Sequence, residues 1–196
     1  MLFRAVYIMQ KKHRIFIAIN LAPDVKKFLA GFEKKWPELP AKWIGADNLH
    51  ITLVFLGDIT DEELGQTCVI AKEVAQKHAL FDIHLNKVTY GSDGKIPPRM
   101  IWAGGEKSKE LSLLKRDLEE ALLEKVNFLL DHKAFAPHVT LARIKEWEWR
   151  RIEPEERPEV HEDIDVLFTV ESIDVMESKL TRQGPRYVIV ESHQLQ

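Results

Sequence analysis

The strongest constraint on the fold is a short signature that occurs twice in the chain. His50-Ile51-Thr52-Leu53 and His138-Val139-Thr140-Leu141 share the order His, apolar residue, Thr, Leu. Each signature ends a segment that has the pattern strand, helix, strand. An internal repeat of this kind predicts two similar lobes that face each other.

Hydrophobic periodicity predicts the elements of both halves. Helices are expected after Pro23, which fits a first helical turn, after Thr60, which forms a capping-box pattern with Glu63, and over residues 108–130. Residues 145–158 are charged, contain two prolines and are expected to form a loop. Strands are expected at residues 14–20, 49–56, 81–86, 100–103, 136–143, 165–173 and 186–191.

These elements predict an α+β fold that is bilobal and duplicated. Two antiparallel sheets would face a central cleft, with helices packed outside. Residues 14–196 are expected to form a single bilobal domain with pseudo-repeats at about 14–90 and 100–191. Residues 1–13 would be an N-terminal extension that need not belong to the core, and Met9 is an alternative start to Met1.

Composition excludes several classes of protein. The 196 residues carry a formal net charge of -3, which argues against a protein that coats duplex DNA through its overall charge. Cys68 is the one cysteine, so neither an intramolecular disulfide nor a zinc site with two cysteine ligands can form. No apolar run is long enough to cross a membrane, and no signal-peptide pattern is present, so a cytoplasmic protein is expected.

The paired signatures combine titratable and hydroxyl side chains. Residues two apart in a strand point to the same face, so His50 and Thr52 share a face, as do His138 and Thr140. Imidazole titrates near neutral pH, so one histidine can donate a proton while the other accepts one. Threonine hydroxyls can donate hydrogen bonds to an anionic phosphate, and Arg143 can add a bidentate contact. This set suits the opening of a phosphodiester without a metal.

Simpler interpretations compete with this one. A single His-x-Thr on a strand is a weak signal, because a lone histidine there is usually structural or merely exposed. Two copies at matched positions of a repeat are harder to explain by core packing. A zinc site is disfavoured because neither a carboxylate nor a third histidine stands at ligand spacing beside either signature.

The sequence resembles the 2H phosphoesterase superfamily, and within it the RNA 2',3'-cyclic phosphodiesterase branch, also described as 2'-5' RNA ligases. The resemblance covers most of residues 14–191. It lies in the stretches RIFIAIN, KWIGADNLHITLVFLGD, PPRMIWAG, FAPHVTLARIK and ESKLTRQGPRYVIV. It implies a bilobal α+β fold and a water-filled cleft with one histidine from each lobe.

The resemblance also implies roles for individual residues. His50 would protonate the leaving 3' oxygen, and His138 would activate the attacking water. Thr52 and Thr140 would hold phosphate oxygens, and Arg143 matches a basic residue that the family often keeps. The near-symmetric signatures alone do not give the direction of proton transfer. Ala136 departs from the family, which often has arginine there, and this change affects RNA binding more than catalysis.

Other aromatic and basic residues are secondary candidates. Trp43 and Trp102 could stack on a base, although core packing is the favoured role for both. Strand alternation is taken to place Phe55 on the His50 face, where it could line the cleft. The segment 145–151, with two tryptophans and two arginines, could meet RNA, but its two glutamates favour a solvated loop.

The leading hypothesis is therefore hydrolysis of RNA 2',3'-cyclic phosphate ends to 2'-phosphomonoesters, with no cofactor and no metal. The alternatives are 2'-5' RNA ligation in the same cleft, a non-catalytic RNA- or nucleotide-binding module, and a metal-dependent hydrolase. The expected partner is an RNA or oligonucleotide that ends in a 2',3'-cyclic phosphate. The protein is expected to be a monomer, with neither a membrane nor an obligate protein partner.

Overall fold

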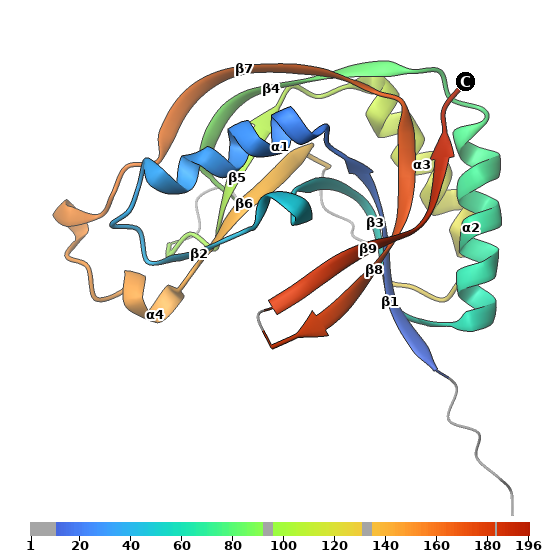
Figure 1. Ribbon diagram of the computed structural model, residues 1–196, viewed down its shortest axis with the longest axis horizontal. Coiled ribbons are helices and arrows are strands. Elements are labelled where there is room, and N and C mark those ends of the chain that lie inside the picture. Colours follow the sequence, from blue (N-terminus) through green and yellow to red (C-terminus); the bar gives the residue numbers. More distant parts are fainter. Residues whose placement is uncertain (1–10, 92–95, 131–134, 183) are drawn as a thin grey trace, which may run out of the picture.

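The computed structural model describes residues 11–91, 96–130, 135–182 and 184–196 (Figure 1). It confirms the α+β class. The helices are α1 (Pro23–Ala30), α2 (Asp61–Ala75), α3 (Lys109–Leu123) and α4 (Glu146–Trp149), with 3-10 turns at Gly31–Lys34, Ala46–Asn48 and Pro154–Glu156. The strands are β1 (Lys12–Asn20), β2 (Ala41–Trp43), β3 (His50–Thr60), β4 (Phe81–Tyr90), β5 (Met100–Gly105), β6 (His138–Ile144), β7 (His161–Val170), β8 (Ser172–Thr181) and β9 (Gly184–Gln194).

The strands form one sheet, not the two sheets that the sequence predicted. The order is β7-β4-β5-β6-β3-β1-β8-β9, and β2 adds to β6. The two signature strands, β3 and β6, pair antiparallel at Ile51 and Val139 and so join the two halves.

The halves of the sheet do not coincide with the halves of the chain. Strand β4 precedes the second repeat in sequence, yet it pairs with β5 and β7. Strands β8 and β9 come from the end of the chain, and β8 pairs with β1. Each half of the sheet therefore combines strands from both repeats.

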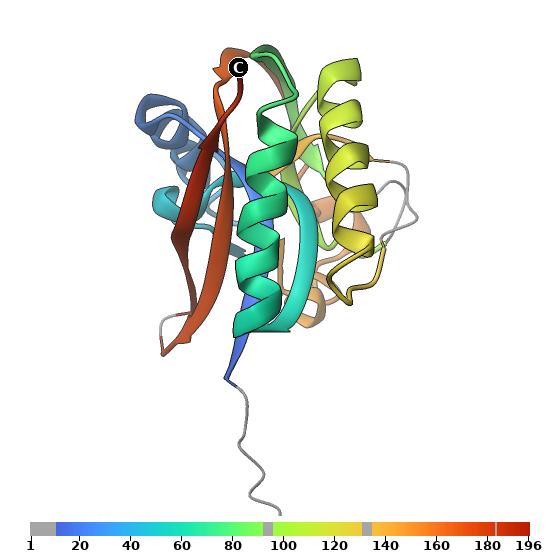
Figure 2. The ribbon, with the colours of Figure 1, turned by 90° about the vertical axis from the view of Figure 1, so that its right-hand side faces the viewer.

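One face of the sheet packs on α2 and α3, which lie side by side (Figure 2). Ile51 and Val139 are at most 1% exposed and share a buried core with one side of α3. That side of α3 consists of Leu111, Leu114, Leu118 and Leu122, all of them fully buried. Because side chains alternate along a strand, the residues that flank Ile51 and Val139 point away from these helices.

Helix α2 begins as the sequence predicted. The Thr60 hydroxyl accepts a hydrogen bond from the Glu63 backbone N–H at 3.2 Å, and the Glu63 carboxylate accepts one from the Thr60 backbone N–H at 2.8 Å. This capping box satisfies two backbone donors at the start of the helix. The hydrogen bonds that the Thr60 N–H and hydroxyl donate to the Glu63 carboxylate also hold the pKa of Glu63 below its ordinary value.

Helix α3 begins as expected but ends earlier. The Ser108 hydroxyl accepts from the Leu111 N–H at 3.1 Å, which caps the helix. The helix ends at Leu123 instead of residue 130, and Leu129 is 93% exposed. Val126 is buried in the core, but Val126 and Asn127 both have low helix propensity, which favours an end to the helix before them.

Two further expectations differ from the structure in the C-terminal third. Strand β8 was not predicted as a separate strand, because its buried residues are consecutive at one end and its other end is charged and exposed. The supposed loop at 145–158 contains α4, because Trp149 is 4% exposed and anchors that turn to the core.

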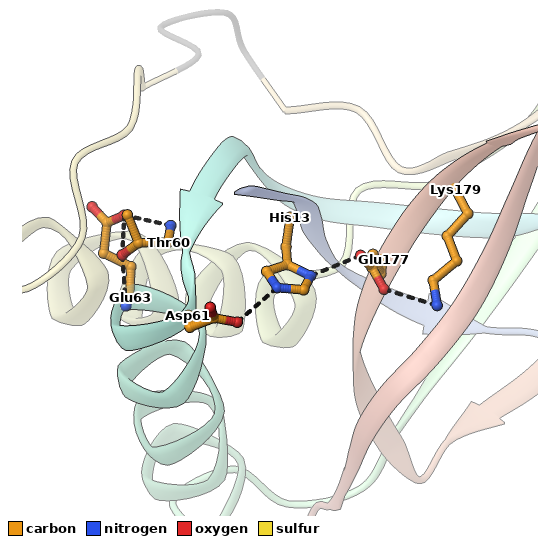
Figure 3. Close-up of polar contacts among 6 residues, drawn as sticks. All are labelled: His13, Thr60, Asp61, Glu63, Glu177 and Lys179. Carbon is orange, nitrogen blue, oxygen red and sulfur yellow. Dashed lines mark hydrogen bonds and ion pairs between the residues drawn. The ribbon is translucent and has the colours of Figure 1, made fainter. Parts of the chain in front are cut away.

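The structured region also begins before residue 14. Strand β1 starts at Lys12, and His13 is buried, whereas residues 1–10 lie outside the described residues. The His13 ring joins β1 to α2 and β8, because Nε2 meets Asp61 and Nδ1 meets Glu177, each at 2.8 Å (Figure 3). Since carboxylates accept from both ring nitrogens, His13 is an imidazolium here, and the hydrogen bonds to Glu177 and Asp61 raise its pKa.

None of the helices within the described ranges is long and apolar enough to span a membrane.

Candidate active site

The antiparallel pairing of β3 and β6 brings the two signatures together. Because Ile51 faces Val139 and the strands run in opposite directions, His50 lies toward Thr140 and Thr52 lies toward His138. These four side chains alternate with the buried pair, so they share the face opposite α2 and α3. Each histidine is thereby placed beside the threonine of the other signature.

A pocket of about 410 Å³ opens on this face. All five residues that the sequence singled out line it: His50, Thr52, His138, Thr140 and Arg143. Its other walls include Arg14, Phe16, Asn48, Phe55 and Tyr187. The pocket is large enough for a nucleotide-sized ligand.

Two polar contacts hold His50. Its Nδ1 lies 2.7 Å from the Asn48 backbone oxygen, and its Nε2 lies 3.0 Å from the Thr52 hydroxyl. A carbonyl oxygen can only accept, so Nδ1 carries a proton and Nε2 is the position that gains or loses one. Phe16 packs against the ring at 4.9 Å, and Tyr187 meets it edge-on at 5.2 Å between centroids.

The second histidine has the same tautomer but different neighbours. The His138 Nδ1 lies 2.8 Å from the Ala136 backbone oxygen, so Nε2 is again the exchangeable position. The Trp102 indole stacks on the His138 ring, with 3.9 Å between centroids and 25° between planes. Trp102 therefore contacts a candidate catalytic group directly, a role that differs from both the core packing and the base stacking considered for it.

The pocket favours neutral histidines in the absence of a ligand. Burial lowers the pKa of His50, the hydrogen bond to Asn48 opposes this, and the positive charge of Lys26 and His138 lowers the pKa further. Burial also lowers the pKa of His138, against a smaller rise from the bond to Ala136. A bound phosphate anion would favour the protonated form of either ring.

A β-bulge brings Phe55 into the pocket. Strict alternation from His50 would turn Phe55 to the opposite face, because the two residues are five positions apart, so alternation was the wrong reason for placing Phe55 beside His50. However, Ala18 pairs with Thr52 and Ile17 with Val54, so Leu53 is an extra residue in β3. The bulge reverses the alternation after Thr52, and Phe55 then lines the pocket with 49% of its surface exposed.

Arg14 is a pocket residue that the sequence reasoning missed. Its guanidinium lies 5.4 Å from the centre of the Phe55 ring, and both residues line the pocket. Arg14 is the one charged residue in the strand stretch RIFIAIN, and this is the sequence signal that could have marked it. The structure shows that it is exposed. The pocket thus has guanidinium groups from both Arg14 and Arg143.

The remaining aromatic candidates do not line this pocket. Trp43 is half-buried in β2 and packs against the core, as its favoured role predicted. Trp147 is 63% exposed beneath the Arg151 guanidinium, at 4.6 Å, and Trp149 is buried. Across the described ranges, no group of three or more His, Cys, Asp or Glu side chains is placed to hold a metal ion.

Comparison with known proteins supports the family expected from these residues. A family model described as LigT like Phosphoesterase matches residues 15–102 and 105–187. An RNA 2',3'-cyclic phosphodiesterase of Aquifex aeolicus is 31% identical over 188 residues, which cover 93% of this chain and 97% of that protein. A second protein of that name, from Geobacillus stearothermophilus, is 35% identical over 136 residues; these cover 68% of this chain and 42% of the longer relative.

The solved structures agree. The protein TT0787 of Thermus thermophilus superposes with a TM-score of 0.79 and 27% sequence identity, covering 93% of this chain and 97% of that one. LigT of E. coli, solved in complex with 3'-AMP, has the same fold, with a TM-score of 0.75 at 21% identity; the match covers 94% of this chain and 99% of that one. From the family match over both halves and these relatives, the chain belongs to the LigT-like phosphoesterase family.

Proposed function

We propose that this protein hydrolyses RNA 2',3'-cyclic phosphate ends to 2'-phosphomonoesters by acid/base catalysis between two histidines. The observation that carries the proposal is the pair of His50 and His138 on one pocket, each with Nδ1 committed to a backbone carbonyl. Each ring therefore offers Nε2 for proton transfer, and two such groups are what a hydrolysis with both an acid and a base requires. The names of the relatives point to the same substrate.

The reaction uses the two histidines in opposite senses. His138 takes a proton from water as the water oxygen attacks phosphorus. The bond from phosphorus to the 3' oxygen breaks, and protonated His50 gives its proton to that oxygen. The products are a 2'-phosphomonoester and a free 3' hydroxyl, and the protons then exchange with solvent. This assignment of acid and base follows the family resemblance.

The neighbouring groups bind the phosphate. Thr52 and Thr140 donate hydrogen bonds to its non-bridging oxygens, and the guanidinium of Arg143 supplies positive charge. Thr52 contacts Nε2 of His50 at 3.0 Å, so its hydroxyl must turn toward the substrate when the ring is protonated. The exposed Phe55 ring offers a surface on which the terminal base can stack.

The test is turnover of an oligoribonucleotide that ends in a 2',3'-cyclic phosphate, with excess EDTA present and phosphorus NMR of the product. Full activity and a 2'-phosphate signal are expected. His50→Ala and His138→Ala should each lower kcat by about 100-fold to 10,000-fold. His84→Ala is the matched control, because His84 pairs with Asp165 away from the pocket and its loss should leave the rate unchanged.

Other outcomes would identify the alternatives. A joined 2'-5' product indicates ligation, binding without turnover indicates a non-catalytic module, and loss of activity with EDTA indicates a metal-dependent hydrolase. We also propose that the protein acts as a monomer, as its sequence predicts. Light scattering at assay concentration checks this. The cytoplasmic location stays a prediction.

A further inference from the structure

A second groove adjoins the active-site pocket. It lies between the turn that precedes β3 and the β8–β9 hairpin, and its volume is about 780 Å³. Asn48, Pro185 and Tyr187 line both the groove and the pocket. The two spaces are therefore neighbours that share a wall.

Hydrogen bonds of Asn48 fix the shared wall in place. The Asn48 side-chain amide donates to the Pro185 backbone oxygen at 2.9 Å, and its oxygen accepts from the Tyr187 N–H at 3.2 Å. The Asn48 backbone oxygen is also the acceptor for Nδ1 of His50. One residue thus ties the edge of β9 to the histidine, so the position of the groove relative to the pocket is set by hydrogen bonds.

The groove is positively charged although the chain as a whole is not. Arg182 and Arg186 line it, against one acidic lining residue, Asp47. Lys42 adds a positive charge beside the β8–β9 hairpin. Its Nζ lies next to Gly184, 3.1 Å from the position that a Cβ on this glycine would occupy. Lys26 donates to the backbone oxygen of Asp47 at 3.2 Å.

The ion pairs formed among the described residues leave out Arg182, Arg186 and Lys42. Acidic residues outnumber basic ones in the chain, with 31 against 28, so a local excess of positive charge beside the pocket is not a consequence of composition. Unpaired arginines on a groove wall are well suited to phosphate groups.

We propose that this groove binds the phosphodiester backbone of the nucleotides that precede the cyclic phosphate, so that the enzyme prefers a single-stranded RNA end to a cyclic mononucleotide. The inference rests on the proposed function. A strand whose last phosphate lies between the histidines must leave the pocket over one of its walls. The wall at Asn48 and Pro185 leads to Arg182 and Arg186, which can neutralise the next phosphates.

The experiment compares two substrates: a 2',3'-cyclic mononucleotide and a tetraribonucleotide with the same 2',3'-cyclic end. The double variant Arg182→Gln/Arg186→Gln should lose about tenfold or more in kcat/KM on the tetranucleotide. Its kcat/KM on the mononucleotide should stay within about twofold. The salt dependence of the tetranucleotide reaction should also become shallower, because each lost phosphate contact lowers the slope by about 0.7.

A matched control uses the other arginine pair that the sequence offered to RNA. Arg150 and Arg151 lie beside α4, and Arg150 forms an ion pair with Glu146. The variant Arg150→Gln/Arg151→Gln removes the same charge from a surface that does not line either space. Both substrates should react with it as they do with the wild type.

The outcomes separate the groove from the proposed function. If Arg182→Gln/Arg186→Gln loses kcat/KM equally on both substrates, or loses none on the tetranucleotide, the proposed role of the groove is wrong. A larger loss of kcat/KM on the tetranucleotide with Arg150→Gln/Arg151→Gln would also contradict the proposal, and it would indicate that the RNA binds beside α4 instead. Failure of the wild type to turn over either substrate would instead reject the proposed hydrolysis.

Discussion

The indole of Trp102 lies against the imidazole of His138, with 3.9 Å between the ring centroids and 25° between the ring planes. Gly91 makes this contact possible, because a Cβ at that position would lie 2.4 Å from the indole. The face of an indole attracts a cation, so Trp102 is placed to stabilise the positive charge that the proposed mechanism puts on His138. In that mechanism Trp102 is a positioning residue that acts through His138.

Trp102→Leu should lower kcat by about twofold to 30-fold, because the lost cation–π contact is worth about 0.5–2 kcal/mol. The pKa assigned to His138 in the pH–rate profile should move to lower pH, since the protonated form loses support. Trp102→Phe keeps an aromatic face and should recover much of the rate. Gly91→Ala should imitate Trp102→Leu by displacing the indole. An unchanged pH profile in Trp102→Leu would show that the ring only fills space.

The direction of proton transfer can be read from a modified substrate. With sulfur in place of the bridging 3' oxygen, the leaving group departs as a thiolate and needs little protonation. His50→Ala should then regain most of the activity that it loses on the natural linkage, a loss of about 100-fold to 10,000-fold. His138→Ala should stay impaired on both substrates. Recovery by His138→Ala alone would reverse the two roles.

The His13 contacts predict a stability that depends on pH. The pKa of His13 is raised by its bonds to Glu177 and Asp61, so its contribution is complete below the ordinary histidine pKa of about 6.5. That contribution is lost as the pH rises through the higher folded-state pKa. At the acid end, burial would raise the pKa of Glu177, but hydrogen bonds from His13 and Lys179 hold it lower, so the carboxylate partner persists well into acid.

His13→Gln should therefore reduce the free energy of unfolding by about 1–3 kcal/mol near pH 6 and by less near pH 9. Urea unfolding across this range measures the difference between the variant and the wild type. His84→Gln is the control, because its partner Asp165 is 93% exposed and the pair should contribute little at any pH. A His13→Gln deficit that stays constant with pH would contradict the charged state.

The capping box at Thr60 should stabilise the fold and have no effect on kcat. Thr60→Ala removes the hydroxyl that accepts from the Glu63 N–H and should cost about 1 kcal/mol. Thr60→Ser keeps the acceptor and should restore most of this stability. Urea midpoints give the stabilities, and kcat of the folded protein should be the same for all three. A change in kcat with Thr60→Ala would mean that the start of α2 also holds the pocket.

The local part of the fold was predictable because it depends on neighbouring residues. The strand stretch before Asn20, the turn at Pro23 and the Thr60–Glu63 cap all appear where propensity and periodicity place them. Errors arose where distant packing decides. Helix α3 ends at Leu123 although Val126 beyond it is still buried, α4 forms around the buried Trp149, and β8 has no alternation to reveal it.

The candidate site follows the same division. The sequence by itself determined the chemistry, because two His-x-Thr strands present imidazole and hydroxyl groups on one face by the two-residue period of a strand. Only the tertiary structure decided that β3 and β6 cross at Ile51 and Val139, which puts both signatures on one pocket. The bulge that turns Phe55 inward, the indole beneath His138 and the arginine groove beside Asn48 likewise arise from contacts between residues far apart in the chain, which no local pattern encodes.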